Sequence, residues 1–233
     1  MKKFWKDVGV ERGPEGGWRV TLDERPIKTQ GGAQQVVPSE ALAEALAAEW
    51  RAQGETIDPR GFVLRDLADF AIDRIAGEPQ ASIERLLPYA ETDTLCYRGD
   101  PGSDALARQE EMWDPLVEAL EARLECRFER VSGIVHCPQP EATMAALRRE
   151  LDRLDPWDMA ALETTVPLAA SLITGLAAIQ PGADAVALFA AANAEEDWQA
   201  ELWGSDAEAE AARAARLGAF ERAVAFAALA RAG

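Results

Sequence analysis

Short alternations of apolar and polar residues fill the first forty positions of the chain and predict β-strands. The expected strands cover residues 6–10, 18–22, 25–29 and 34–37, and clusters of glycine, proline and acidic residues separate them. A helix follows after Pro38, with Ser39 as its N-cap, and ends before Gly54. Its apolar positions share one face, which can pack on the sheet. The pattern therefore predicts a β-rich α+β domain over residues 1–58.

From residue 59 onward the apolar positions recur at helical spacing. The expected helices cover residues 62–76, 79–89, 103–125, 140–154, 156–179, 184–203 and 206–232, and residues 127–135 are expected to be extended. Ser205 and Asp206 are expected to cap the last helix. The predicted fold class is an α+β N-terminal domain with a small β-sheet and a packed helix. An all-α orthogonal helical bundle over residues 59–233 follows it.

The net charge of the chain narrows the range of binding partners. The chain has 24 lysine and arginine residues against 41 aspartate and glutamate residues, which gives a formal net charge of −17. Such a chain is repelled by nucleic acid and by anionic membrane surfaces. No apolar run reaches membrane-spanning length, and no signal or transit peptide is visible. We expect no nucleic-acid partner, no membrane insertion and a cytoplasmic location.

The sequence lacks the common catalytic and cofactor motifs. It contains no phosphate-binding loop, no dinucleotide fingerprint and no nucleophile elbow. Its three cysteines, Cys96, Cys126 and Cys137, do not have the spacing of metal ligands. His136, the single histidine, is adjacent to Cys137, and adjacent residues of a strand point to opposite faces. We therefore select no catalytic residue and expect no metal and no cofactor, and the missing motifs favour a binding protein over an enzyme.

The predicted helix over residues 184–203 carries a carboxylate in an unexpected place. At 100° per residue, Glu195 and Gln199 fall in the middle of a broad apolar arc. Asn193, Asp197 and Glu201 lie on the opposite, water-facing side. The arc consists of Leu188, Phe189, Ala191, Ala192, Trp198, Leu202 and Trp203.

Burying an unpaired carboxylate is costly, so Glu195 needs a partner. One interpretation is internal: an arginine of the core, or a buried backbone group, binds the carboxylate. The other is a partner-binding surface in which Glu195 and Gln199 are polar anchors. Trp198, Trp203 and the helix-ending Gly204 would then be part of the same surface.

A second polar cluster lies between Tyr89 and Arg98. One interpretation is an internal network in which Glu91 and Asp93 cap backbone groups or pair with Arg98. The alternative is the site of a small hydrolase or transferase. A third possibility for the whole chain is a structural subunit that stays in a finished complex.

Several segments together resemble the assembly chaperone family of the F-type ATP synthase α subunit, which is found in mitochondria and α-proteobacteria. Single segments are weak signals, but they occur in the family's order from residue 4 to residue 204. They are FWKDV at 4–8, GW at 17–18, LDERPIKT at 22–29, EWRAQGE at 49–55, AIDR at 71–74, YAETDTLCYR at 89–98, Gln109, WDPL at 113–116, and Glu195, Gln199, Trp203 and Gly204.

The resemblance implies a protein without enzymatic activity that holds the unassembled α subunit until the β subunit takes its place. Glu195 matches the family's functionally important acid, and Gln199, Trp203 and Gly204 match its neighbours. We expect the free protein to be a monomer. The obligate interfaces of such subunits are large and apolar, so a chaperone that covers one would prevent aggregation.

The sequence departs from the family pattern at two places. The family's turn usually reads Asp-Gly-Arg-Pro, whereas Glu24 stands here after Asp23. A type I′ turn requires positive φ at both central residues, so a different turn is expected. The family also often has a histidine after its Trp-Gly pair, but residues 205–208 contain none, so no role for histidine carries over.

Overall fold

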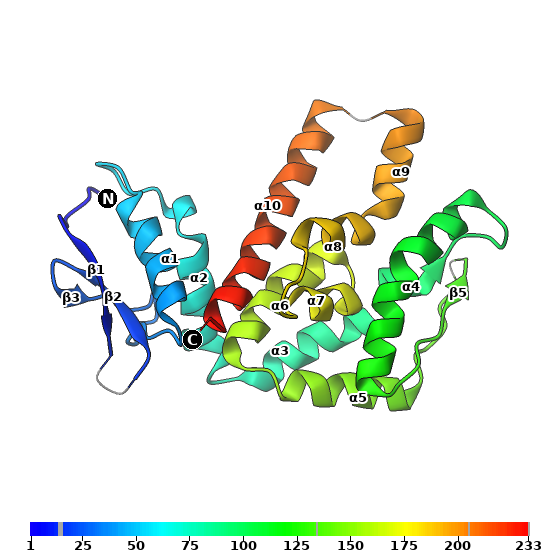
Figure 1. Ribbon diagram of the computed structural model, residues 1–233, viewed down its shortest axis with the longest axis horizontal. Coiled ribbons are helices and arrows are strands. Elements are labelled where there is room, and N and C mark those ends of the chain that lie inside the picture. Colours follow the sequence, from blue (N-terminus) through cyan, green and yellow to red (C-terminus); the bar gives the residue numbers. More distant parts are fainter. Residues whose placement is uncertain (14–15, 134, 205, 233) are drawn as a thin grey trace. The chain divides into compact units, whose positions relative to one another are not determined.

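The computed structural model describes residues 1–13, 16–133, 135–204 and 206–232 (Figure 1). The chain forms two compact units. The first comprises residues 1–79, 155–161 and 225–233, and the second comprises residues 80–154 and 162–224. The predicted domain boundary after residue 58 is a statement about which part of the chain folds independently. It stays a prediction.

A three-stranded antiparallel sheet opens the first unit. It consists of β1 (Val8–Arg12), β2 (Trp18–Leu22) and β3 (Arg25–Pro26), in that order. The strand expected at residues 34–37 is wrong. Gln34 and Val37 form only isolated bridges, to Lys28 and Trp18. The backbone N–H of Val36 donates to the Gln34 carbonyl in a local turn, so it is not available to a ladder.

The turn between β2 and β3 also differs from expectation. Asp23 and Glu24 have φ values of 48° and 66°, so both central residues lie in the left-handed region that a type I′ turn requires. The expectation of a different turn is therefore wrong. The Asp23 carboxylate holds the turn in place because Oδ1 accepts the backbone N–H groups of Lys6 and Asp7, each at 2.9 Å.

Helix α1 (Glu40–Arg51) packs on this sheet and buries Leu42 and Leu46. Ser39 is its N-cap, as predicted, and accepts the N–H of Leu42. The 3₁₀ turn η1 (Pro59–Gly61), helix α2 (Val63–Phe70) and the π-helical turn η2 (Ala71–Ile75) follow. Glu49 of α1 caps α2 by accepting the backbone N–H groups of Leu64 and Arg65.

One ion pair of the first unit makes its stability depend on pH. Arg231 Nη1 lies 2.5 Å from Asp158 Oδ1, yet burial raises the pKa of the Asp158 carboxyl from 3.8 to about 6. The folded protein then binds this proton more tightly than the unfolded chain does, so stability falls as pH rises from about 4 to 6. Between these pH values the free energy of unfolding of the wild type decreases, and we expect Asp158→Asn to remove up to about 3 kcal/mol of this decrease.

Urea unfolding of wild type and Asp158→Asn at about pH 4 and about pH 7 measures this effect. The wild type should lose more stability than the variant between the two conditions. Equal losses would show that Asp158 has the same proton affinity in the folded and unfolded chains.

The second unit is mainly helical, and the predicted fold class is confirmed. Helices α6 and α10 contribute residues to both units. Among the described residues, no helix is long and apolar enough to cross a membrane. The elements from residue 79 onward are α3 (Pro79–Leu86), η3 (Leu87–Ala90), η4 (Thr94–Cys96), β4 (Tyr97–Arg98), α4 (Asp104–Leu124), β5 (Val131–Ser132), α5 (Glu141–Asp152), α6 (Pro156–Ala169), α7 (Leu172–Ala178), α8 (Ala185–Ala192), α9 (Ala194–Trp203) and α10 (Ala207–Ala230).

Two predicted helices are each broken in two. The helix expected over residues 156–179 stops at Ala170, whose φ is 47°, and α7 begins with Ser171 as N-cap. The helix expected over residues 184–203 breaks at Asn193, whose φ and ψ are −107° and 19°. Both breaks lie beside the site described below. The predicted extended segment contains β5, which pairs in parallel with β4.

Candidate partner-binding site

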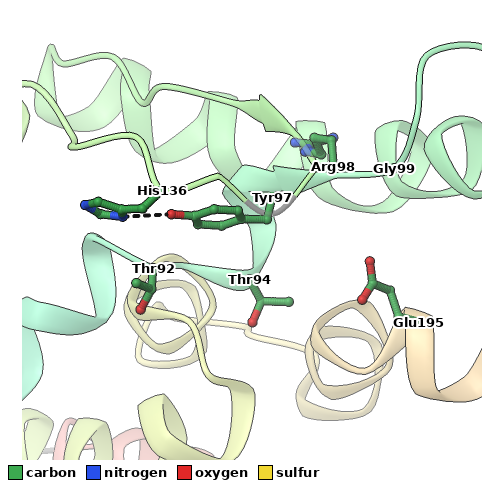
Figure 2. Close-up of a pocket in the computed structure, with 8 residues that line it drawn as sticks. Thr92, Thr94, Tyr97, Arg98, Gly99, His136 and Glu195 are labelled. Atoms are coloured by element: carbon green, nitrogen blue, oxygen red, sulfur yellow. Dashed lines mark hydrogen bonds between the residues drawn. The ribbon is translucent and has the colours of Figure 1, made fainter.

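A pocket of about 630 Å³ in the second unit lies between two regions that are far apart in the sequence, the segment over residues 89–98 and the helix that carries Glu195 (Figure 2). The segment that ends in β4 forms one wall, and the first turn of α9 brings Glu195 to another. The loop after β5 closes a third side. The lining residues are Thr92, Thr94, Tyr97, Arg98, Gly99, Gly133, His136 and Glu195.

Glu195 has an internal partner, but this partner is a glutamine. Gln109 of α4 donates from Nε2 to Glu195 Oε1 at 2.6 Å. Gln109 is itself buried, and its Oε1 accepts the backbone N–H of Gly99 at 2.7 Å. One carboxylate oxygen is therefore fixed by a buried amide, while the Glu195 side chain as a whole stays exposed at the pocket wall.

The predicted apolar arc does not survive the break at Asn193. Leu188 and Phe189, before the break, are buried in the core of the second unit. Leu202 and Trp203, after it, are 56% and 77% exposed. An interruption changes the helical phase, so positions counted at 100° per residue across Asn193 no longer share a face. The predicted arc is therefore divided at Asn193: its α8 part is buried, and within α9 Glu195 and Gln199 lie on an exposed face.

Ion pairs hold the face of α9 that was expected to meet water. Asp197 is half-buried and binds the Arg213 guanidinium through both of its oxygens, at 2.6 and 2.5 Å. Glu201 likewise binds Arg108 through both oxygens, at 2.7 and 2.9 Å. These bidentate contacts position α9 against α10 and α4.

Asp93 and Thr94 attach the other pocket wall to the break between α6 and α7. Asp93 is fully buried, and its two oxygens accept the backbone N–H groups of Leu95 and Ile173 at 3.1 and 3.0 Å. Burial raises the pKa of this carboxyl to about 6. Thr94 donates from Oγ1 to the Ala170 carbonyl at 2.9 Å. Because the helix is interrupted at Ala170, the Ala170 carbonyl and the Ile173 N–H can bind Thr94 and Asp93. These two contacts anchor the segment before β4.

The other members of the predicted polar cluster have different partners. Arg98 donates to Asp114 at 2.7 Å and stacks over Trp113, with 5.3 Å between the guanidinium carbon and the ring centroid. Glu91 accepts the backbone N–H of Gln139 at 3.1 Å. Glu91 and Asp93 thus bind backbone groups, and Arg98 pairs with Asp114.

The pocket offers hydroxyl groups and one carboxylate to a ligand. Tyr97 Oη lies 3.1 Å from His136 Nδ1, as Figure 2 shows. Cys96 is buried behind this wall, and burial raises the pKa of its thiol, so it remains protonated. Among the described residues, no group of His, Cys, Asp and Glu side chains is placed to hold a metal ion. The arrangement suits hydrogen bonding of a positively charged or donor-rich group.

Sequence reasoning did not select several of these residues. Thr92, Thr94 and His136 line the pocket, and Gln109 binds Glu195 across 86 positions of sequence. Gln109 appears among the resembling segments, but a lone glutamine on a helix gives no sign of its partner. Only the tertiary fold brings these residues together.

Comparisons with known proteins agree on one family. The family model described as "ATP12 chaperone protein" matches residues 2–121. The crystal structure of Atp12 from Paracoccus denitrificans has a TM-score of 0.92 and 40% sequence identity, and it covers 99% of this chain and 98% of that chain. Protein atp12, mitochondrial, from Schizosaccharomyces pombe is 27% identical over 88% of this chain and 74% of its own length. Protein ATP12, mitochondrial, from Saccharomyces cerevisiae is 26% identical over 87% and 76%.

Proposed function

This chain belongs to the ATP12 chaperone family, and we propose that it binds the unassembled ATP synthase α subunit and protects its interface until the catalytic head assembles. An unassembled subunit exposes the large apolar surface that its neighbour would cover, and such surfaces promote aggregation. A chaperone that binds this surface more weakly than the rightful neighbour is displaced by mass action when that neighbour arrives.

The observation that carries this proposal is that Glu195 shares one face of α9 with exposed apolar side chains about two turns further along the helix. One Glu195 oxygen is held by Gln109 at 2.6 Å, while Leu202 and Trp203 are 56% and 77% exposed. A fixed charge on the same helix face as exposed aromatic and aliphatic groups is typical of protein-binding surfaces. The proposed contact residues are Glu195, Trp198, Gln199, Trp203 and Gly204.

An enzymatic function has less support. The buried Cys96 thiol has a raised pKa and cannot serve as an activated nucleophile. The pocket carboxylate, Glu195, is bound by the Gln109 amide, which cannot act as a base. We propose that the protein acts in the cytoplasm as a monomer when free, without nucleotide or metal.

We expect Glu195→Gln to weaken binding of the α subunit while the fold survives. Glutamine keeps the size of the side chain, and its oxygen can still accept from Gln109. Loss of a charge-assisted hydrogen bond to the partner costs about 1.5–3 kcal/mol, which is roughly ten- to a hundredfold in affinity. Titration of labelled α subunit gives the affinity, and thermal melting gives the stability.

Glu221→Gln is the matched control because Glu221 is an exposed carboxylate of α10 that lines neither this pocket nor the hollow beside Gln199 and Trp203. Its affinity should equal that of wild type. A large loss of stability in Glu195→Gln, with unchanged affinity once folded, would return Glu195 to a purely structural role. Light scattering of refolding α subunit tests the function itself, and scattering that the wild-type protein does not reduce at molar excess would refute it.

A further inference from the structure

The first unit carries a hollow of its own, with a volume of about 310 Å³. Phe4, the segment over residues 25–30 and Trp50 contribute to its walls. These three belong to segments that carry the family resemblance, yet none of them lines the pocket around Glu195. The hollow is therefore a separate feature of the surface.

A chain of aromatic rings ends at this hollow. The ring centroids of Phe4 and Trp5 are 5.0 Å apart, those of Trp5 and Trp50 are 5.0 Å apart, and those of Trp50 and Phe62 are 4.5 Å apart. Trp5 and Phe62 are buried, whereas Phe4 is 67% exposed. An apolar side chain that enters the hollow would continue the chain of rings and cover Phe4.

Two cations on the rim form no ion pair within the described part of the chain, although Arg25 lies near enough to the Asp23 carboxylate to interact with it electrostatically. Arg25 and Lys28 are exposed, and no ion pair is found for either of them among the described residues. The third basic lining residue, Arg65, is already paired with Asp66 at 2.6 Å. The free charge on the rim is therefore positive, although the whole chain carries −17.

The one carboxylate of the hollow is fully engaged inside the unit. Asp69 is buried, and its Oδ1 accepts Gln35 Nε2 at 2.5 Å while its Oδ2 accepts the Gln30 backbone N–H at 3.0 Å. Both of its oxygens are occupied by these donors, and its single negative charge leaves the lining cations Arg25, Lys28 and Arg65 in excess.

The edge of the sheet beside the hollow is poorly suited to adding a strand. The Ile27 N–H points toward β2, where it donates to the Val20 carbonyl at 3.1 Å. By alternation, Pro26 stands where the outward N–H of β3 would be, and proline has none. A ligand at this edge is therefore recognised through side chains.

We propose that this hollow docks a segment of a partner protein in which a large apolar side chain is flanked by carboxylates. The apolar group would stack on Phe4 and Trp50, and the carboxylates would meet Arg25 and Lys28. This contact is distinct from the one at Glu195 and has the opposite charge preference. A partner bound at both places gains avidity, because the second contact forms within the complex.

Two matched peptides test the charge preference on the full-length wild-type protein. One is acetyl-Glu-Asp-Leu-Phe-Asp-Glu-amide, and the other carries lysine at each acidic position. The acidic peptide should shift the NMR resonance of the Trp50 indole N–H, assigned with Trp50→Phe, and should bind more tightly than the basic one. The preference should shrink as salt screens the charges.

Variants locate the contact. Arg25→Glu with Lys28→Glu should weaken binding of the acidic peptide roughly two- to thirtyfold, and Phe4→Ser roughly tenfold. Arg60→Glu with Arg74→Glu changes the net charge equally at exposed positions that do not line the hollow, and it should leave binding unchanged.

Equal binding of the two peptides, or no shift at Trp50 at millimolar peptide, would overturn the proposal. An equal effect of the control pair would do the same, because it would reduce the preference to net charge. The peptide experiment contains no α subunit. A failure here is therefore distinguishable from a failure of the proposed chaperone function.

Discussion

Replacement of Trp113 by alanine is expected to lower the free energy of unfolding of the second unit by about 3–5 kcal/mol. Trp113 is fully buried, and its Nε1 donates to the Ala191 carbonyl at 2.7 Å. The substitution removes the ring from the core and the hydrogen bond from the end of α8. Because Ala191 lies two residues before the break at Asn193, the variant should also displace α9 and weaken α-subunit binding.

Trp203→Ala is the control for this prediction. It makes the same chemical change at a tryptophan that is 77% exposed, so stability should change by less than about 0.5 kcal/mol. If Trp203 contacts the partner, its variant should lose affinity without losing stability. Urea unfolding followed by circular dichroism, together with α-subunit titration, separates the two cases. Equal stability losses in both variants would contradict the burial of Trp113.

Asp93→Asn is expected to lower the free energy of unfolding by about 1–3 kcal/mol for each N–H group that loses its acceptor. Both Asp93 oxygens accept backbone N–H groups, from Leu95 and Ile173. An asparagine has one oxygen, so its NH₂ group must face one of these donors. The break between α6 and α7 would then lose one of the contacts that attach the pocket wall.

Asp100→Asn, at an exposed position after β4, controls for the loss of a carboxylate and should leave stability unchanged. The loss in Asp93→Asn is measured by urea unfolding at about pH 7, where the wild-type carboxyl is mainly ionised. A variant as stable as wild type would show that solvent or a local shift satisfies the freed N–H group.

Sequence periodicity predicted the helical segments but not their interruptions. Pro167 lies inside α6 without ending it, and the helix stops three residues later at Ala170. Thr94 and Asp93 satisfy the groups freed there, from a segment more than seventy positions away. A break that long-range contacts stabilise leaves no local signal, so composition favours one long helix. The Asp23–Glu24 turn was also mispredicted, since backbone contacts from Lys6 and Asp7 stabilise it.

The family resemblance was read correctly from the ordered segments, because short motifs in a fixed order carry more information than periodicity. The continuous apolar arc around Glu195 was not, because the helix is interrupted at Asn193. A carboxylate on an apolar face needs a partner. The structure supplies a partner, Gln109, but exposes the helix face. Neither the residues nor their spacing reveals that α9 leaves the core after Asn193.

The weak attachment of α9 has a consequence for its dynamics. Ala194 is the only buried residue of this helix, and the remainder is held by the Gln109 hydrogen bond to Glu195 and by three ion pairs, to Arg108, Arg213 and Arg216. Exposed ion pairs are screened by salt, so local unfolding of α9 should become easier as ionic strength rises. Its amide protons should then exchange with solvent faster than those of the buried helices. The surface that carries Glu195 can thus reshape at low cost, which suits the proposed binding of an incompletely assembled partner.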